Sequence, residues 1–120
     1  KQAGQLASKM RYLSAPWVRM TESGQWLKNG AHGNACARAF ADGIAGLPQV
    51  QCMFPVQANA VFLQLPSAIQ EGLRARGWRF YTFIGGGARF MFAWDADMRR
   101  VQQLVHDLRE LALAANSTQP

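Results

Sequence analysis

The sequence has little of what marks several common protein classes. It contains two cysteines in 120 residues, Cys36 and Cys52, which is too few for a disulfide framework, and their spacing is not that of a paired metal or redox motif. We expect both to be reduced, buried thiols. The apolar stretches are short and interrupted by charge or glycine, so no segment is predicted to cross a membrane.

Charge and polarity are also limited. Charged residues make up 17% of the chain and hydrophobic residues 49%, a balance that predicts a folded domain and excludes a chain that is disordered throughout. The length fits one domain, or a piece of one. The first ten residues do not form a basic start followed by an apolar run, so we expect no secretory signal and a cytoplasmic location. The chain begins with Lys1, and we expect it to be a processed product or a fragment.

The hydrophobic pattern changes period along the chain and predicts an α+β fold. Helical spacing is found at both ends and in a short central segment, whereas strand-like segments surround that centre. The expected helices and strands, in order, are helices at 2–20 and 25–45, strands at 50–54 and 60–65, a helix at 66–76, strands at 78–84 and 88–94, and a helix ending near Ala114. This order, α-α-β-β-α-β-β-α, predicts a two-layer sandwich with helices on one face of an antiparallel sheet.

Local signals place the boundaries of these elements. We expect Pro16 to kink or divide the first helix, and Gly85–Gly87 to form a tight hairpin turn. Asp95 is the expected N-cap of the last helix. The first helix has no obvious sheet to cover, so we divide the chain into linking helices at 1–46, a small α+β domain at 47–115 and a disordered tail at 116–120.

Most catalytic and metal motifs are missing from the sequence. His32 and His106 are isolated, and neither metal-ligand spacing nor a nucleophile elbow occurs. Arg89 stands out because it follows the glycine turn in an otherwise apolar strand, where a guanidinium is costly without an anionic partner. An internal salt bridge, an exposed edge position and a ligand carboxylate all remain open as explanations.

The net charge of +6 leaves two non-enzymatic alternatives: a basic α+β module that binds nucleic acid, or an interaction domain that docks through its first helix. Proteins that bind nucleic acid usually concentrate their basic residues. Here the densest cluster is only Arg74, Arg76 and Arg79. We therefore expect neither a nucleic-acid nor a membrane partner.

Several separate blocks, in the same order, resemble the C-terminal part of bacterial low-specificity L-threonine aldolases, especially the phenylserine aldolase branch. The blocks are Lys1–Tyr12, Leu27–Ala35, Phe54–Phe62, Gly77–Gly85 and Arg89–Asp95. The resemblance implies the small domain of an aspartate-aminotransferase-like fold, the cofactor pyridoxal phosphate, an amino-acid substrate and a homo-oligomer. It implies cleavage of β-hydroxy-α-amino acids to glycine and an aldehyde.

The resemblance also implies roles for single residues. Arg89 matches the arginine that holds the substrate α-carboxylate, and Lys1 and Lys9 match a basic pair that approaches the cofactor phosphate from the adjacent subunit. His32, with Asn34, is expected to pack. The family's cofactor lysine lies upstream of Lys1, and Lys28 in its helical context is not expected to replace it, so the chain alone is expected to be inactive.

Overall fold

The computed structural model describes residues 9–83 and 85–117, and the described part is an elongated α+β structure of 69 × 29 × 25 Å. Its elements follow the expected order of two helices, two strands, a helix, two strands and a helix. They are α1 (Met10–Glu22), α2 (Gln25–Gly43), β1 (Gln51–Cys52), β2 (Ala60–Gln64), α3 (Ser67–Ala75), β3 (Tyr81–Thr82), β4 (Gly87–Met91) and α4 (Met98–Ser117).

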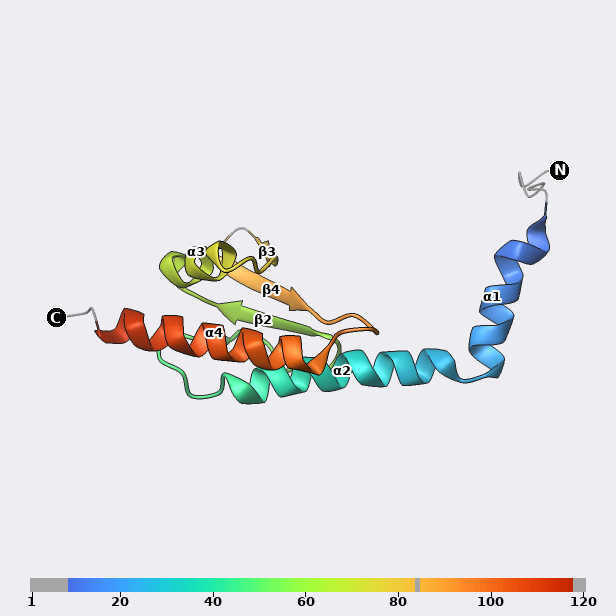
Figure 1. The fold of residues 1–120 in the computed structure, drawn as a ribbon, viewed down its shortest axis with the longest axis horizontal. Coiled ribbons are helices and arrows are strands. Elements are labelled where there is room, and N and C mark those ends of the chain that lie inside the picture. Colours follow the sequence, from blue (N-terminus) through green and yellow to red (C-terminus); the bar gives the residue numbers. More distant parts are fainter. Residues whose placement is uncertain (1–8, 84, 118–120) are drawn as a thin grey trace.

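The four strands form one antiparallel sheet in the order β1-β2-β4-β3, and helices pack on one of its faces, as predicted. Side chains of β2 and β4 alternate between a buried set and a more exposed set, as expected for a sheet covered on one side. The buried set (Val61, Leu63, Ala88 and Phe90) meets Phe40 of α2 and Leu108 of α4 in a single core. The opposite face carries no helix in Figure 1.

Helix α2 reaches this core through small residues. A Cβ added at Gly33 would lie 3.0 Å from the main-chain oxygen of Phe92, so the glycine permits α2 to approach this segment closely. Helix α1, by contrast, buries no residue and projects from the sheet-containing body, with the turn at Gly24 (φ 66°) between the two helices. Pro16 lies inside α1, which continues through it as one helix.

The outer strands are shorter than the sequence predicts. The segment 50–54 pairs as a strand only at Gln51 and Cys52, because Pro55 follows closely and has no N–H to continue the ladder. The segment 78–84 pairs only at Tyr81 and Thr82. Trp78 stays with the helical layer, because its main-chain N–H donates to Leu73 at 3.1 Å and its indole N–H donates to Asp107 at 2.7 Å.

The last helix differs from the prediction at both ends. The first-turn N–H of Arg99 donates to Asp97 Oδ1 at 2.9 Å, so Asp97, and not Asp95, supplies the capping carboxylate. The helix ends at Ser117 and not near Ala114. Its apolar residues Val101, Leu104, Leu108 and Ala112 are buried in the core. Of the expected tail, residues 118–120 lie outside the described residues.

Candidate functional site

The open face of the sheet carries a row of aromatic side chains. Phe54 lies edge-on to Phe62 with ring centres 5.5 Å apart, Phe62 lies edge-on to Phe83 at 6.2 Å, and Phe83 stacks with Tyr81 at 6.4 Å. The row depends on Gly87, because a Cβ there would lie 2.6 Å from the Phe83 ring. Together, these rings form an apolar row on the open face, with Phe62 on β2, Tyr81 on β3, and Phe54 and Phe83 just beyond the ends of β1 and β3.

Arg89 lies on this same open face, in the middle of β4. Its register partners are Phe62 on one side and Tyr81 on the other. The guanidinium carbon is 5.3 Å from the centre of the Tyr81 ring. The described residues contain no carboxylate in an ion pair with Arg89, so the internal salt bridge that the sequence left open is not found there. An exposed, aromatic-stacked guanidinium has the geometry to bind a carboxylate bidentately.

Of the two expected phosphate-binding lysines, the structure describes only Lys9. Lys1 lies outside the described residues. Lys9 is exposed immediately before α1, with a left-handed backbone (φ 60°). Figure 1 shows the start of α1 at the far end of the molecule from β4. Within one copy of the described chain, Lys9 and Arg89 therefore do not lie at one site.

His32 connects α2 to the segment before α4. Its Nε2 is 2.8 Å from the main-chain oxygen of Ala96 and 3.6 Å from the Sγ of Cys36. His32 is exposed and Cys36 is buried. The hydrogen bond to Ala96 gives His32 a structural role, but its side chain is exposed and is not packed as the sequence interpretation expected. Lys28 is exposed one turn earlier on the same helix.

The sequence interpretation missed Tyr81 as the partner of Arg89. The hairpin turn offered a signal: residues at equal distance on each side of Gly85 pair across β3 and β4, which places Tyr81 opposite Arg89. The turn itself is as predicted, with left-handed Gly85 and Gly86 (φ 97° and 83°). Cys52 was also misjudged, because it is exposed and not buried. Its place on the outer strand β1 explains the exposure.

A second polar cluster, also missed, surrounds Asp107 on α4. Its carboxylate accepts hydrogen bonds from Trp78 Nε1 at 2.7 Å, Gln103 Nε2 at 3.0 Å and Arg76 Nη1 at 3.0 Å. Desolvation raises the pKa of this carboxyl, but the three donors outweigh desolvation and hold the pKa below its ordinary value. Arg76 also pairs with Glu110 at 2.7 Å. The cluster fastens the α3–β3 connection to α4 and has a structural role.

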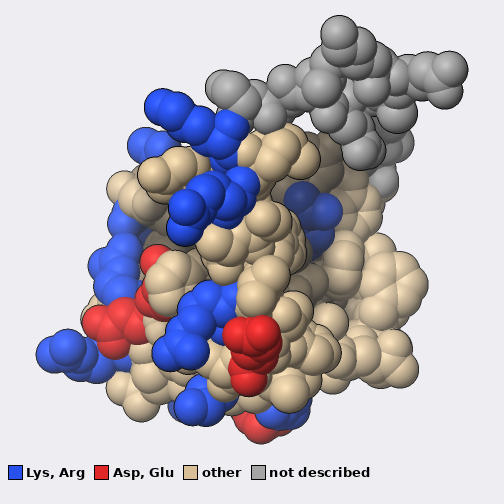
Figure 2. Space-filling model, turned by 90° about the vertical axis from the view of Figure 1, so that its right-hand side faces the viewer, with Lys and Arg blue, Asp and Glu red and all other residues tan. Residues whose placement is uncertain are grey.

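Other classes of site gain no support from the described residues. No group of three His, Cys, Asp or Glu side chains in residues 9–83 and 85–117 is placed to hold a metal ion. No helix in that part of the chain is both long and apolar enough to cross a membrane. Seen from the α1 end, Lys and Arg side chains are interspersed with acidic ones and do not form a continuous stripe (Figure 2).

Comparison with known proteins agrees with the resemblance read from the sequence. No protein-family model matches the chain. The chain is 60% identical over 110 residues to a low specificity L-threonine aldolase of Pseudomonas aeruginosa, an alignment that covers 91% of the chain and 32% of the relative. It is 56% identical over 115 residues to another from a Pseudomonas species, covering 95% of the chain and 33% of that relative. Over nearly its whole length, the chain is therefore similar to a segment amounting to about one third of low-specificity L-threonine aldolases.

Proposed function

We propose that this chain forms the C-terminal domain of a pyridoxal-phosphate-dependent L-threonine aldolase. The proposal is supported by the two relatives, which carry that name and match the chain over more than nine-tenths of its length. We expect residues 1–46 to join this domain to the rest of the enzyme and to a neighbouring subunit, with the small domain at 47–115. The homo-oligomeric state and a cytoplasmic location belong to the same proposal.

The observation on which the proposal depends most is the environment of the Arg89 side chain. It stands among aromatic rings on the uncovered face of the sheet, with Tyr81 as its stacking partner and no acidic partner in the described chain. A guanidinium in this setting can bind a substrate α-carboxylate through two parallel hydrogen bonds. The surrounding rings reduce competition from water once the face is covered, which strengthens that ionic contact.

The reaction breaks the Cα–Cβ bond of a β-hydroxy-α-amino acid. The β-hydroxyl loses its proton as its oxygen becomes the aldehyde oxygen, and Cα gains a proton to give glycine. Pyridoxal phosphate supplies the electron sink for this step when it is bound. The role proposed for this chain is to hold the substrate carboxylate at Arg89 and so fix the orientation of the bond to be broken. Lys1 and Lys9 are proposed to reach the cofactor phosphate of an adjacent subunit.

The test is kinetic and uses the full-length enzyme that contains this chain. We expect Arg89→Ala to raise the KM for threonine and to lower kcat/KM, with a loss of transition-state stabilisation of about 2–4 kcal/mol. This loss is the cost of removing one partner of an enclosed charge pair and leaving the other alone. Arg89→Lys should recover only part of the loss, because an ammonium cannot make the bidentate contact. Arg38→Ala is the matched control, because Arg38 is exposed on α2 in the helical layer.

Two outcomes would contradict the proposal. Unchanged kinetics in a folded Arg89→Ala enzyme would remove Arg89 from the substrate site. Turnover of threonine by residues 1–120 alone would contradict the proposal that the cofactor lysine lies elsewhere, and loss of that turnover in Lys28→Ala would identify Lys28 as the lysine in question.

A further inference from the structure

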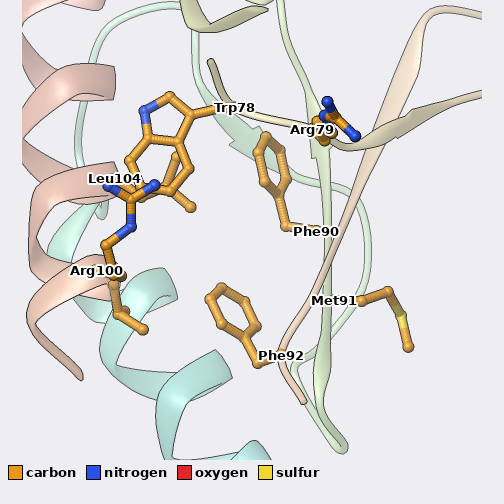
Figure 3. A pocket seen from close by; sticks show the side chains of 8 residues that line it. Trp78, Arg79, Phe90, Met91, Phe92, Arg100 and Leu104 are labelled. Atoms are coloured by element: carbon orange, nitrogen blue, oxygen red, sulfur yellow. The ribbon is translucent and has the colours of Figure 1, made fainter. Parts of the chain in front are cut away.

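A cavity of about 190 Å³ lies between β4 and the first turns of α4. Trp78 and Leu104 form one wall, and Phe90 and Phe92 stand opposite them (Figure 3). Val101 and Arg100 of α4 also line it. Arg89 is not among the lining residues, and successive side chains of a strand point to opposite faces. Phe90 is in the core beneath the helices, so the cavity lies on the helical side of β4, although Met91, which shares the face of Arg89, also lines it.

The cavity exists because β3 is short. The hairpin pairs Tyr81 with Arg89, and pairing continues neither to Phe80 and Phe90, the next partners, nor to Arg79 and Met91. The segment before β3 instead turns toward α4, where the bond from Trp78 Nε1 to Asp107 fixes the indole. The Trp78 ring therefore lies away from the edge of β4 and forms an aromatic wall of the cavity. The position of that wall is set by a buried carboxylate and does not depend on a bound molecule.

The mouth of the cavity carries positive charge. The Arg100 guanidinium carbon lies 4.5 Å from the centre of the Trp78 ring, and no acidic group of the described chain forms an ion pair with it. Arg100 belongs to the first turn of α4, where the helix dipole disfavours a cation and favours an anion. Arg79 lines the cavity from the strand side, across from Arg100 (Figure 3). A bound anion would relieve this unfavourable arrangement.

We propose that this cavity binds a small aromatic monocarboxylate, with its ring between Trp78 and the pair Phe90 and Phe92, and its carboxylate on Arg100. The size fits one substituted ring, because an engineered apolar cavity of about 150 Å³ accepts benzene. A nucleotide or a long acyl chain would exceed the volume. Inorganic phosphate would leave the apolar walls unused. The geometry does not depend on the aldolase proposal, because neither Arg89 nor a cofactor takes part.

Titration of the 120-residue chain with benzoate, followed by proton–nitrogen NMR, tests the proposal. The Trp78 ring lines the cavity, and its indole N–H, which donates to Asp107, gives a site-specific signal that Trp78→Phe identifies by its loss. We expect a saturable shift of this signal. Benzyl alcohol, which keeps the ring and lacks the charge, should bind at least tenfold more weakly.

Two arginine variants separate a specific site from general attraction to a basic protein. Arg100→Gln should weaken benzoate binding about tenfold, equivalent to about 1.4 kcal/mol. Arg99→Gln should change it little, because the side chain of Arg99 is 90% exposed and lies near Asp97, with the guanidinium Nε 3.6 Å from its carboxylate. Val101→Met, which adds volume inside the cavity, should also weaken binding while the spectrum stays that of a folded protein.

Three results would overturn the proposal. One is the absence of a saturable shift at millimolar benzoate in the folded chain. Another is equal weakening by Arg99→Gln and Arg100→Gln, which would indicate only non-specific charge attraction. The third is loss of binding in Arg89→Gln with retention in Arg100→Gln, which would place the carboxylate on the open face of the sheet.

Discussion

Arg89 and Tyr81 are register partners on adjacent strands, and the guanidinium carbon of Arg89 lies 5.3 Å from the centre of the Tyr81 ring. The ring restricts the guanidinium on one side and leaves its hydrogen-bonding edge open. A cation stacked on an aromatic face in this way gains about 0.5–2 kcal/mol, depending on how well water is excluded. Tyr81 is thus a candidate for positioning Arg89 without itself contacting a substrate.

The first prediction concerns this pair in the full-length enzyme. Tyr81→Leu should raise the KM for threonine by about twofold to thirtyfold, in line with the loss of about 0.5–2 kcal/mol of stacking. Tyr81→Phe should keep a KM near the original value, because it retains the ring. Steady-state kinetics on both variants check this. An equal rise in KM in both variants would assign the role to the tyrosine hydroxyl and contradict the stacking argument.

The second prediction concerns pH and Asp107. Its pKa is lower in the folded chain than in the unfolded chain, so its contribution to stability is present above the unfolded pKa of about 3.9 and is lost as the pH falls through the lower folded pKa. Asp107→Asn should therefore lower the free energy of unfolding by about 1–3 kcal/mol near neutral pH. The difference in the free energy of unfolding between this variant and the original protein should become smaller in acid.

Urea unfolding of both proteins near pH 7 and again near pH 3 measures this difference. Glu110 shares Arg76 with Asp107 and also faces His106, so Glu110→Gln serves as the control for general charge loss on the same helix. A difference that stays constant or grows in acid would show that shape, and not the ionised carboxylate, matters at position 107.

The order of the elements was predictable because each element carries its own signal. The stripe containing Leu104 and Leu108 has helical spacing, and the alternation of Val61 and Leu63 has strand spacing. The three glycines predicted the turn at Gly85 for a local steric reason. These features depend on residues close together in the sequence, so periodicity and turn chemistry were enough to find them.

The features that the sequence did not predict depend on distant residues. Segment 78–84 has strand-like composition, but Trp78 leaves the ladder for a hydrogen bond with Asp107, 29 residues further along the chain. The row that joins Phe54, Phe62 and Phe83 requires the register of three strands. Arg89 was singled out by its apolar context. Its stacking partner becomes visible only when the hairpin is paired.

The third prediction concerns thiol reactivity. Cys52 is exposed on the outer strand β1, whereas Cys36 is fully buried at 0% exposure. A thiol reagent should therefore label one cysteine in the folded chain and two in denaturant. Partial burial raises the pKa of the Cys52 thiol, so the labelling should be slow at neutral pH and accelerate as the pH rises.

The control variant is Cys52→Ser, which should remove the labelling seen in the folded chain. Persistent labelling in that variant would indicate that α2 opens to expose Cys36.

The fourth prediction compares two glycines on α2. A Cβ at Gly33 would lie 3.0 Å from the main-chain oxygen of Phe92, whereas a Cβ at Gly30 would meet nothing within 4 Å. Gly33→Ala should therefore lower the free energy of unfolding by about 1–3 kcal/mol, because the contact is with backbone that cannot rotate away. Gly30→Ala should raise it by up to about 1 kcal/mol, because alanine is the better helix former.

The two substitutions make the same chemical change one turn apart, so opposite signs in urea unfolding would isolate the close contact between α2 and the end of β4. The chemical shift of the Asn59 side-chain amide gives a second measure, because this amide donates to the same Phe92 oxygen at 2.9 Å. Gly33→Ala should move that signal and Gly30→Ala should not. If both substitutions stabilise the chain, then α2 has room to move away from the strand, and the small residues on this face serve no packing purpose.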